Sequence, residues 1–360
     1  MDFKQRLTSH ALPAHGGDLQ WAEATFGVPK AQWLDVSTGI SPWSWPVPQL
    51  PPHVWRDLPP SPAKLLQAAA HYYAWPAKQI APTPGSQWAI ATVPKLVPLG
   101  VVALPTVGYQ EHEAAWREVG HTIQHYDDIT QLAALINNAD VNYVVVINPN
   151  NPSTARASSE RLLALALAMA LFNQQKASLF MIDEAFADDV TDSHFAAESC
   201  PSNLLRLRSV GKFFGLAGLR LGFALASPEW AARLNAALPT WANSHPALYI
   251  GEKALSDSAW IQAQRVRIQQ NAAQLQSVLS AHYGEAQVHS AGLFCSVFGE
   301  KQGLLQDFIH FAEQGMLTRF IACDRGIDKH NAILRFGLPG DRWPTFHSCF
   351  NKTLQACATP

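Results

Sequence analysis

Three polar side chains occur in a fixed order along the middle of this chain, and each suits one task in carbonyl chemistry. Asn151 lies in the segment NPNNP, Asp183 in MIDEA and Lys212 in SVGKFFG. A primary amine can hold an aldehyde as a Schiff base, and a carboxylate can keep a pyridine nitrogen protonated as an electron sink. An amide can donate a hydrogen bond to a ring hydroxyl without adding a charge. These residues in this order predict a site for pyridoxal 5'-phosphate (PLP), with Lys212 and Asp183 as the catalytic residues.

A second group of residues can bind the phosphate of such a cofactor. Backbone N–H groups, hydroxyls and a guanidinium are the usual phosphate donors in proteins. Taken singly, each candidate is more often a turn, a helix cap or a surface charge, and only their order along the chain favours a site. The candidates are Gly85, Ser86, Gln87, Ser209 and Arg220.

Composition limits the classes to which this protein can belong. At 360 residues the chain exceeds the length at which one hydrophobic core stops growing, so two domains are expected. Apolar residues make up 48% and charged residues 15%, which favours burial against a second copy, and we expect a homodimer. The formal charge of −2 and the lack of a Lys/Arg-rich run argue against nucleic acid and anionic membranes as partners.

Neither targeting nor metal-binding patterns are evident. Residues 1–10 lack the apolar core of a signal peptide, and no apolar stretch reaches about 18 residues. We therefore expect a soluble cytoplasmic protein. The five cysteines form no C-x-x-C pair and the 14 histidines lack ligand spacing, so we predict neither a disulfide framework nor a metal site.

The apolar runs that must position these side chains have the length of strands. Most are continuous, which is typical of strands covered on both faces of a sheet. After the second run, Ser158-Ser159-Glu160 precedes leucines at helical spacing through Leu171, which predicts a capped helix within a β-α-β unit. A mostly parallel sheet binds ligands beyond the carboxyl ends of its strands. Asn151, Asp183 and Lys212 each lie at or just past the end of a predicted strand. The predicted strands span 101–104, 143–147, 179–182, 204–207 and 222–225.

The regions on either side of this sheet differ in pattern. The proline-rich stretch 43–62 predicts an extended arm and not a helix, and a helix is expected over 65–73. Beyond Pro246 the pattern predicts one long helix from about Leu248 to Tyr283, followed by strands at 293–298 and 332–336. We therefore predict a large domain over 45–245, and a small domain built from 1–44, with an N-terminal arm, and 246–360.

From about His15 to Gly340, these motifs resemble the fold type I PLP enzymes of the aminotransferase class. Within that class, HGGD at 15–18, LDVSTGI at 34–40 and Phe186 are most similar to the threonine-phosphate decarboxylase family of cobalamin biosynthesis. Histidinol-phosphate aminotransferases are the next family. The resemblance implies an α/β fold with a mostly parallel seven-stranded sheet and a smaller α/β domain. It also implies PLP-dependent decarboxylation of L-threonine O-3-phosphate to (R)-1-amino-2-propanol O-2-phosphate.

The resemblance assigns further roles to individual residues. Asn151 would donate to the ring hydroxyl of PLP, and Tyr109 would stack on the ring. Arg220, Ser209 and Ser86 would bind the cofactor phosphate. Arg335 would bind the substrate carboxylate, and the His15-Gly16-Gly17 turn would help hold the substrate phosphate. The full set of substrate-binding residues implied in this way is His15, Gly16, Gly17, Thr38, Gly39, Asn151 and Arg335.

The chain also departs from the pattern of the class. Phe186 stands where many aminotransferases have a tyrosine, and it cannot donate to a cofactor oxygen, which weakens a transaminase interpretation. Leu58-Pro59-Pro60 replaces Tyr-Pro-Asp, and Ser153-Thr154 replaces the common Thr-Gly. Two alternatives stay open: an aminotransferase acting on histidinol phosphate or a related amino acid phosphate, and a regulatory protein that binds PLP without turnover. A nucleotide-binding loop is excluded because Phe213 follows Lys212.

Overall fold

The structure is a computed structural model in which residues 12–173, 177–189, 195, 197–323, 325 and 331–357 are described, except for the side chains of 354–357. The expectation for residues 1–10 and the side chain of Cys357 lie outside the described residues. The chain divides into two compact units. Unit 1 comprises Met1–Pro42 and Ile268–Pro360, and unit 2 comprises Trp43–Arg267.

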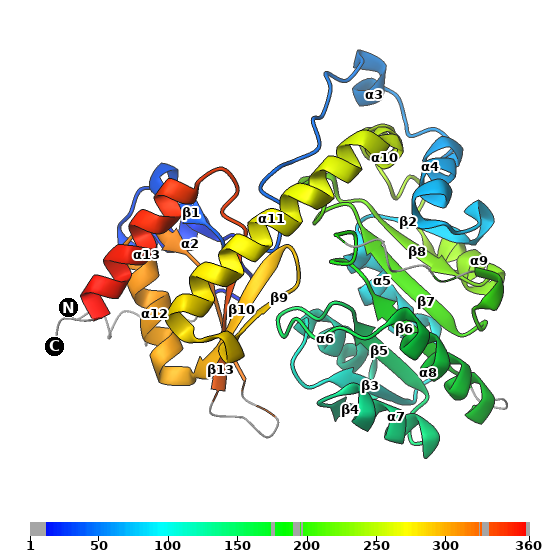
Figure 1. Ribbon diagram of the computed structural model, residues 1–360. Coiled ribbons are helices and arrows are strands. Elements are labelled where there is room, and N and C mark those ends of the chain that lie inside the picture. The colour runs from blue at the N-terminus through cyan, green and yellow to red at the C-terminus, as the bar shows by residue number, and fades with distance from the viewer. Residues whose placement is uncertain are drawn as a thin grey trace. The chain divides into compact units, whose positions relative to one another are not determined.

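Unit 2 is built around a seven-stranded sheet of order β2-β8-β7-β6-β5-β3-β4 (Figure 1). The pairs from β4 through β7 are parallel, whereas β8 is antiparallel to both β7 and β2. The predicted mostly parallel seven-stranded sheet is therefore confirmed. Its strands are β2 (Ile80–Thr83), β3 (Val101–Pro105), β4 (Thr122–Tyr126), β5 (Tyr143–Ile147), β6 (Leu179–Asp183), β7 (Leu204–Ser209) and β8 (Gly222–Ala226).

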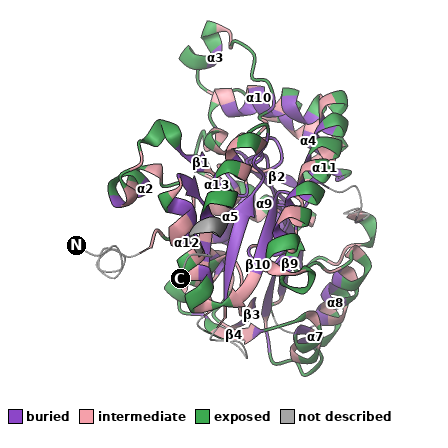
Figure 2. Ribbon diagram, turned by 60° about the vertical axis from the view of Figure 1, so that its left-hand side comes forward, coloured by how far each residue is buried: buried purple, intermediate pink, exposed green. Residues whose placement is uncertain are grey.

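The strand-by-strand prediction missed both edges of this sheet. β2 contains Pro82, which cannot donate to a ladder and is tolerated at an edge. β4 alternates polar and apolar residues and is only partly buried. The apolar runs identified from sequence are the central strands, whose residues are buried on both faces, as the purple strands in Figure 2 show.

Helices cover both faces of the sheet in unit 2. One face packs against α5, α6 and α9 in a continuous core that includes Val145, Met181 and Leu205. The alternate strand residues Val144 and Ile182 are equally buried, so the opposite face is covered as well. The helices of unit 2 are α3 (Pro52–Arg56), α4 (Ala63–Tyr73), α5 (Ser86–Thr92), α6 (Gln110–Val119), α7 (Ile129–Asn137), α8 (Ser159–Phe172), α9 (Pro228–Ala237) and α10 (His245–Ser256).

Two helix predictions can be compared directly with these bounds. The capped helix is confirmed as α8, where Ser158 Oγ accepts a hydrogen bond from the N–H of Arg161 at 3.3 Å. The prediction that the proline-rich stretch contains no helix is wrong: α3 forms within it. Pro52 occupies the first turn of α3, where its missing N–H is not needed.

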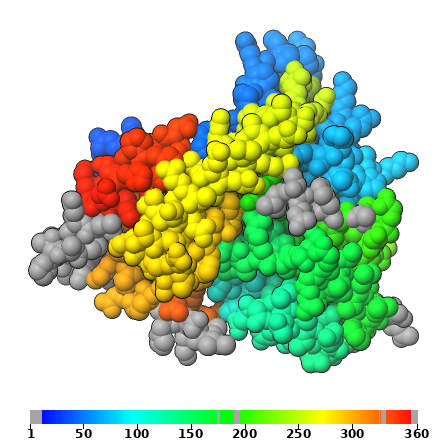
Figure 3. Space-filling model, viewed as in Figure 1, coloured from blue at the N-terminus to red at the C-terminus, as the bar shows by residue number. Residues whose placement is uncertain are grey.

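The single long helix predicted beyond Pro246 is wrong, because the chain forms α10 and then α11 (Ser258–Tyr283). Asp257 separates them: its carboxylate accepts from the N–H of Trp260 at 3.1 Å and so caps the second helix. Residues 258–267 of α11 belong to unit 2, and the remaining residues belong to unit 1. Figure 3 shows the exposed side of this helix in yellow.

The expected domain boundary at 245/246 differs from the unit boundary at 267/268. The reason is the close packing of α10 within unit 2. A Cβ atom on Gly251 of α10 would lie 3.0 Å from Leu65 Cδ1 of α4 and 2.3 Å from Leu221 Cδ2. This glycine lets α10 approach its neighbours, so α10 belongs with the large sheet.

Unit 1 is a smaller α/β unit. Its four-stranded antiparallel sheet has the order β12-β13-β10-β9, and β1 pairs in parallel with β11. Cys295 and Cys349 of unit 1 are buried thiols that form no disulfide. No helix among the described residues is both long and apolar enough to cross a bilayer. The elements are α2 (Leu19–Phe26), β1 (Leu34–Asp35), β9 (Val288–Ser290), β10 (Phe294–Glu300), α12 (Lys301–Glu313), β11 (Met316–Leu317), β12 (Arg319–Ala322), β13 (Asn331–Gly337) and α13 (Trp343–Cys357).

Candidate active site

A buried carboxylate marks the end of strand β6. Asp183 Oδ2 lies 2.9 Å from His112 Nε2, and Asp183 Oδ1 accepts from the N–H of Ala185 at 3.0 Å. Only 2% of the His112 side chain and 5% of the Asp183 side chain are exposed. Each oxygen of a carboxylate can accept more than one hydrogen bond, so this fixed group can also face a protonated ring nitrogen. His112 was not identified from the sequence; its one signal is its place in the first turn of α6, three residues after Tyr109.

Tyr109 lies beside this pair, at the start of α6. Its ring meets that of His112 edge to face, with 6.3 Å between centroids and an interplanar angle of 83°. Its hydroxyl donates to Gln87 Oε1 at 3.1 Å. The pKa of Tyr109 is raised to about 12, mainly by burial and also by the Glu111 and Asp183 carboxylates, while Arg220 acts in the opposite direction. The phenol is therefore neutral near pH 7 and can serve as a flat apolar surface.

Lys212 follows the end of β7 in a tight turn. Ser209 Oγ accepts from the N–H of Gly211 at 3.1 Å, which fixes the turn that carries the lysine. The half-buried Lys212 places its Nζ 5.2 Å from the centroid of the Phe186 ring. Because Phe186 follows Asp183 by three residues, the loops after β6 and β7 bring the amine and the carboxylate to one end of the sheet.

Gly85, Ser86 and Arg220 also lie together. Gly85 has a φ of +76°, and a Cβ atom there would lie 2.6 Å from a terminal nitrogen of Arg220. A Cβ on Gly222 would lie 2.5 Å from the backbone N of Ser86, so two glycines allow this close approach. The first N–H groups of α5 have no acceptor within the helix. A guanidinium beside such N–H groups is suited to binding a phosphate.

Asn151 lies half-buried in the turn after β5. Its neighbour Asn150 donates to the carbonyl of Val107 at 2.7 Å, which ties this turn to the loop before Tyr109. The polar groups of unit 2 at these strand ends therefore include one acceptor, the Asp183 carboxylate, and several donors: an amine, an amide, a hydroxyl and a guanidinium. These groups fit PLP. Because Gly85 has no side chain, the guanidinium of Arg220 can lie directly beside the backbone that would bind the phosphate.

Unit 1 holds a second candidate site, formed by two arginines. Arg319 and Arg335 are direct cross-strand partners on β12 and β13. The pKa of Arg335 is lowered to about 10, mainly by burial and also by the charge of Arg319, while Asp35 acts in the opposite direction. Burial also lowers the pKa of Arg319. An anion would relieve both effects, so the pair suits a phosphate or carboxylate. Arg319 was not identified from the sequence.

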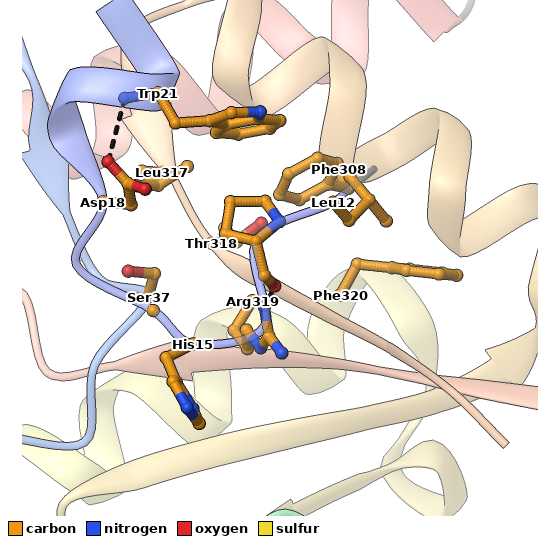
Figure 4. A pocket seen from close by; sticks show the side chains of 12 residues that line it. Leu12, His15, Asp18, Trp21, Ser37, Phe308, Leu317, Thr318, Arg319 and Phe320 are labelled. Carbon is orange, nitrogen blue, oxygen red and sulfur yellow. Dashed lines mark hydrogen bonds between the residues drawn. The ribbon is translucent and has the colours of Figure 1, made fainter. Parts of the chain in front are cut away.

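The turn at His15 packs close to these arginines. Arg335 donates to the carbonyl of Ser37, and Arg319 donates to the carbonyls of Pro13 and Ala14. The N–H of Gly17 donates to Ser37 Oγ at 2.7 Å. Figure 4 shows His15, Ser37 and Arg319 among the side chains around one pocket, and Gly16 also lines it. Thr38 and the buried Gly39 follow in the same loop after β1, so the implied substrate residues of unit 1 lie close together.

Comparisons with known proteins find similarity over most of the chain. Residues 55–327 match the family model of aminotransferase class I and II. The chain is 35% identical to a threonine-phosphate decarboxylase of Pseudomonas aeruginosa over 91% of this chain and 93% of that protein. A bifunctional adenosylcobalamin biosynthesis protein of Leptospira interrogans is 26% identical over 71% of this chain and 31% of its own length. The solved histidinol-phosphate aminotransferase of Sinorhizobium meliloti, in complex with PLP, has a TM-score of 0.79 at 19% identity, over 98% of this chain and 97% of that chain.

Proposed function

The chain belongs to the aminotransferase class I and II family and, within it, to the threonine-phosphate decarboxylases; we infer that it decarboxylates L-threonine O-3-phosphate with PLP. The product is (R)-1-amino-2-propanol O-2-phosphate, used in cobalamin biosynthesis. The observation that carries this inference is the 35% identity to the Pseudomonas aeruginosa enzyme over nearly the whole chain. The strand-end residues of unit 2 and the arginine pair of unit 1 support it.

PLP, when bound, supplies an electron sink for the pair of electrons left on Cα as carbon dioxide departs. The chain's own residues then have separate tasks. Lys212 binds the cofactor through Nζ and later delivers a proton to Cα of the product. Asp183 keeps the ring nitrogen protonated, and His112 and the N–H of Ala185 hold that carboxylate in one orientation. Asn151 donates to the ring hydroxyl, and Tyr109 stacks on the ring.

Phosphate binding divides between the two units in this proposal. Ser86, Ser209, Arg220 and the N–H groups of the 85–87 turn bind the phosphate of the cofactor. The substrate's carboxylate and phosphate are bound by Arg335, with Arg319 and the His15 turn supplying further donors. The lowered pKa values of the two arginines support a substrate with more than one negative charge.

We also propose that the protein works as a cytoplasmic homodimer. Support comes from large apolar side chains that are exposed in unit 2. Burying them against a second copy of the chain would remove their apolar surface from water. Trp55 is 69% exposed and Leu58 is 64% exposed, both in the proline-rich segment that includes α3. Figure 2 shows α3 in green as a largely exposed element.

The test is to incubate PLP-loaded protein with O-phospho-L-threonine and, separately, with histidinol phosphate plus 2-oxoglutarate. Carbon dioxide and glutamate are measured in both reactions. We expect carbon dioxide from the first and no glutamate from the second. Formation of glutamate alone would make the protein an aminotransferase. The absence of both products would favour a PLP-binding regulatory protein.

A further inference from the structure

Tyr109 is held at its hydroxyl by the side chain of Gln87, of which only the backbone N–H has a role in the proposed function, and through it by Glu111, which has none. The hydroxyl donates to Gln87 Oε1 at 3.1 Å, and Gln87 Nε2 donates to Glu111 Oε2 at 3.1 Å. Gln87 comes from α5, whereas Tyr109 and Glu111 come from the start of α6. The three side chains form a short hydrogen-bonded chain between these neighbouring helices.

The direction of this chain follows from the chemistry of its last member. An ionised carboxylate only accepts hydrogen bonds, so Glu111 must face the NH₂ group of Gln87. The carbonyl oxygen of the same amide then faces Tyr109 and can only accept. The hydroxyl of Tyr109 therefore donates, and its proton points to Gln87. Without Glu111, either end of the amide could face Tyr109, and the ring would lose one of its supports.

The backbone that carries Tyr109 is fixed separately. A Cβ atom on the preceding Gly108 would lie 2.8 Å from Pro105 Cγ and 2.9 Å from Ile147 Cδ1, so the loop is closely packed there. The ring edge meets His112, which itself contacts Asp183. The hydroxyl, at the far end of the side chain, is a further point at which the plane of the ring is held.

We propose that Glu111 and Gln87 are positioning residues that set the plane of the Tyr109 ring against the ring of PLP. This inference rests on the proposed function, because it requires that Tyr109 stack on the cofactor. Glu111 acts through Gln87 and Tyr109 and touches neither cofactor nor substrate. Its loss should therefore weaken PLP binding and change the optical activity of bound PLP, and the effect should depend on the Tyr109 hydroxyl.

The experiment compares Glu111→Ala, Tyr109→Phe and the double variant with wild type. Apoprotein of each is titrated with PLP to give a dissociation constant, and the visible circular dichroism is recorded per bound cofactor. Glu111→Ala should raise the dissociation constant about five-fold, the scale of one ordinary hydrogen bond, because Glu111 acts on the cofactor only through Gln87 and Tyr109. In the Tyr109→Phe background the same change should have almost no further effect, because the hydroxyl through which Glu111 acts is absent.

Two further variants separate positioning from folding. Glu111→Gln should bind PLP nearly as wild type does, because its amide carbonyl can still accept from Gln87. Glu118→Ala removes an exposed carboxylate from the same helix and should change nothing. Equal effects of Glu111→Ala with and without the Tyr109 hydroxyl would overturn the inference, as would an unchanged dissociation constant and spectrum. Wild-type protein that binds no PLP would instead overturn the proposed function, and this inference with it.

Discussion

His112 Nε2 and Asp183 Oδ2 are 2.9 Å apart in a site from which water is almost excluded. The two residues come from different elements: Asp183 ends β6, and His112 lies in the first turn of α6. A buried carboxylate needs hydrogen-bond donors, and here one oxygen is served by the backbone and the other by the imidazole. The orientation of the carboxylate that would face the ring nitrogen thus depends on a side chain 71 residues away in sequence.

The first prediction concerns this contact. His112→Phe keeps a ring of similar volume but leaves Asp183 Oδ2 without its imidazole partner. We expect the dissociation constant for PLP to rise about ten-fold or more, because a hydrogen bond to a charged group contributes about 1.5–3 kcal/mol. The measurement is a PLP titration of the apoprotein, accompanied by kcat/KM for O-phospho-L-threonine.

A second buried histidine in unit 2 provides the control. The Nε2 atom of His121 lies 3.0 Å from the carbonyl oxygen of Pro94, and its Nδ1 accepts from the N–H of Gly100 at 3.3 Å. His121→Phe should lower the free energy of unfolding by about 1–3 kcal/mol, as His112→Phe should, because each leaves buried polar groups unpaired. Only His112→Phe should change PLP affinity; if the two variants bind PLP equally well, the contact has no role in the site.

How much of this site could be predicted from sequence depends on how each residue is specified. Asn151 follows and Asp183 ends a continuous apolar strand, so these strand ends could be located from the chain alone. Lys212 follows β7, in which leucines alternate with Arg206 and Arg208, and its motif located it. His112 and Gln87 act through side chains that meet only after helices have packed, and no local pattern marks such a meeting. The edge strand β4 was missed for a related reason, because a half-exposed strand lacks the long apolar run of a central one. The other edge strand, β2, is buried, but it is short and contains Pro82.

The arginine pair illustrates the same limit in unit 1. Arg335 could be identified from its motif, but Arg319 becomes its neighbour through the register between β12 and β13. That register depends on the length of the connection between the strands and on their burial, and a one-residue shift would move Arg319 to the other face. The break at Asp257 shows the opposite case: a helix-capping residue was present in the sequence, but the surrounding helical pattern concealed it.

The second prediction concerns the glycine beneath Arg220. Gly85→Ala places a Cβ atom 2.6 Å from a terminal nitrogen of Arg220, which must move. We expect about ten-fold weaker PLP binding, because a displaced guanidinium loses part of its contact with phosphate. The alanine also strains the backbone, because Gly85 has φ +76° and ψ +158°, a conformation essentially confined to glycine, which should cost about 1–3 kcal/mol of stability.

Gly27→Ala separates these two effects. Gly27 has a φ of +73° and a Cβ atom there would meet nothing within 4 Å, so its substitution adds strain without crowding. Both alanine variants should lose stability in thermal unfolding, and Gly85→Ala should lose more, because Gly27 has a left-handed helical conformation that alanine tolerates better. Weakened PLP binding should be confined to Gly85→Ala, and an equal loss in Gly27→Ala would attribute the effect to general destabilisation.

The third prediction tests the central amine. Lys212→Ala should abolish the long-wavelength absorbance of the PLP-loaded protein, because no primary amine remains to bind the aldehyde at that position. Decarboxylation should fall by about 10³-fold or more, since the proton donor to Cα is lost together with the covalent link. Lys253→Ala, a change to another lysine of unit 2 placed over Tyr249, should keep both the spectrum and turnover. An unchanged spectrum in Lys212→Ala would refute the assignment of this residue.

The fourth prediction concerns the pH at which the arginine pair loses its charge. The pKa of Arg335 is lowered to about 10, first by burial and then by the charge of Arg319. A cation with a lowered pKa is protonated below that value and neutral above it. Affinity for an anion should therefore be constant below about pH 10 and then fall, by at most about ten-fold for each further pH unit while one proton is lost. The measurement is the inhibition constant of inorganic phosphate between about pH 8 and pH 11.

Removing the neighbouring charge tests the cause of this dependence. Arg319→Gln should weaken phosphate binding at pH 8, because one cation is lost, but it should also move the fall in affinity to higher pH, because Arg335 no longer faces a like charge. Arg342→Gln, which removes an exposed guanidinium elsewhere in unit 1, should leave the profile in place. If Arg319→Gln shifts the fall to lower pH, or leaves it unmoved, the two arginines do not repel each other in the free site. The affinity of the pair for phosphate would then need a different explanation from the relief of that repulsion.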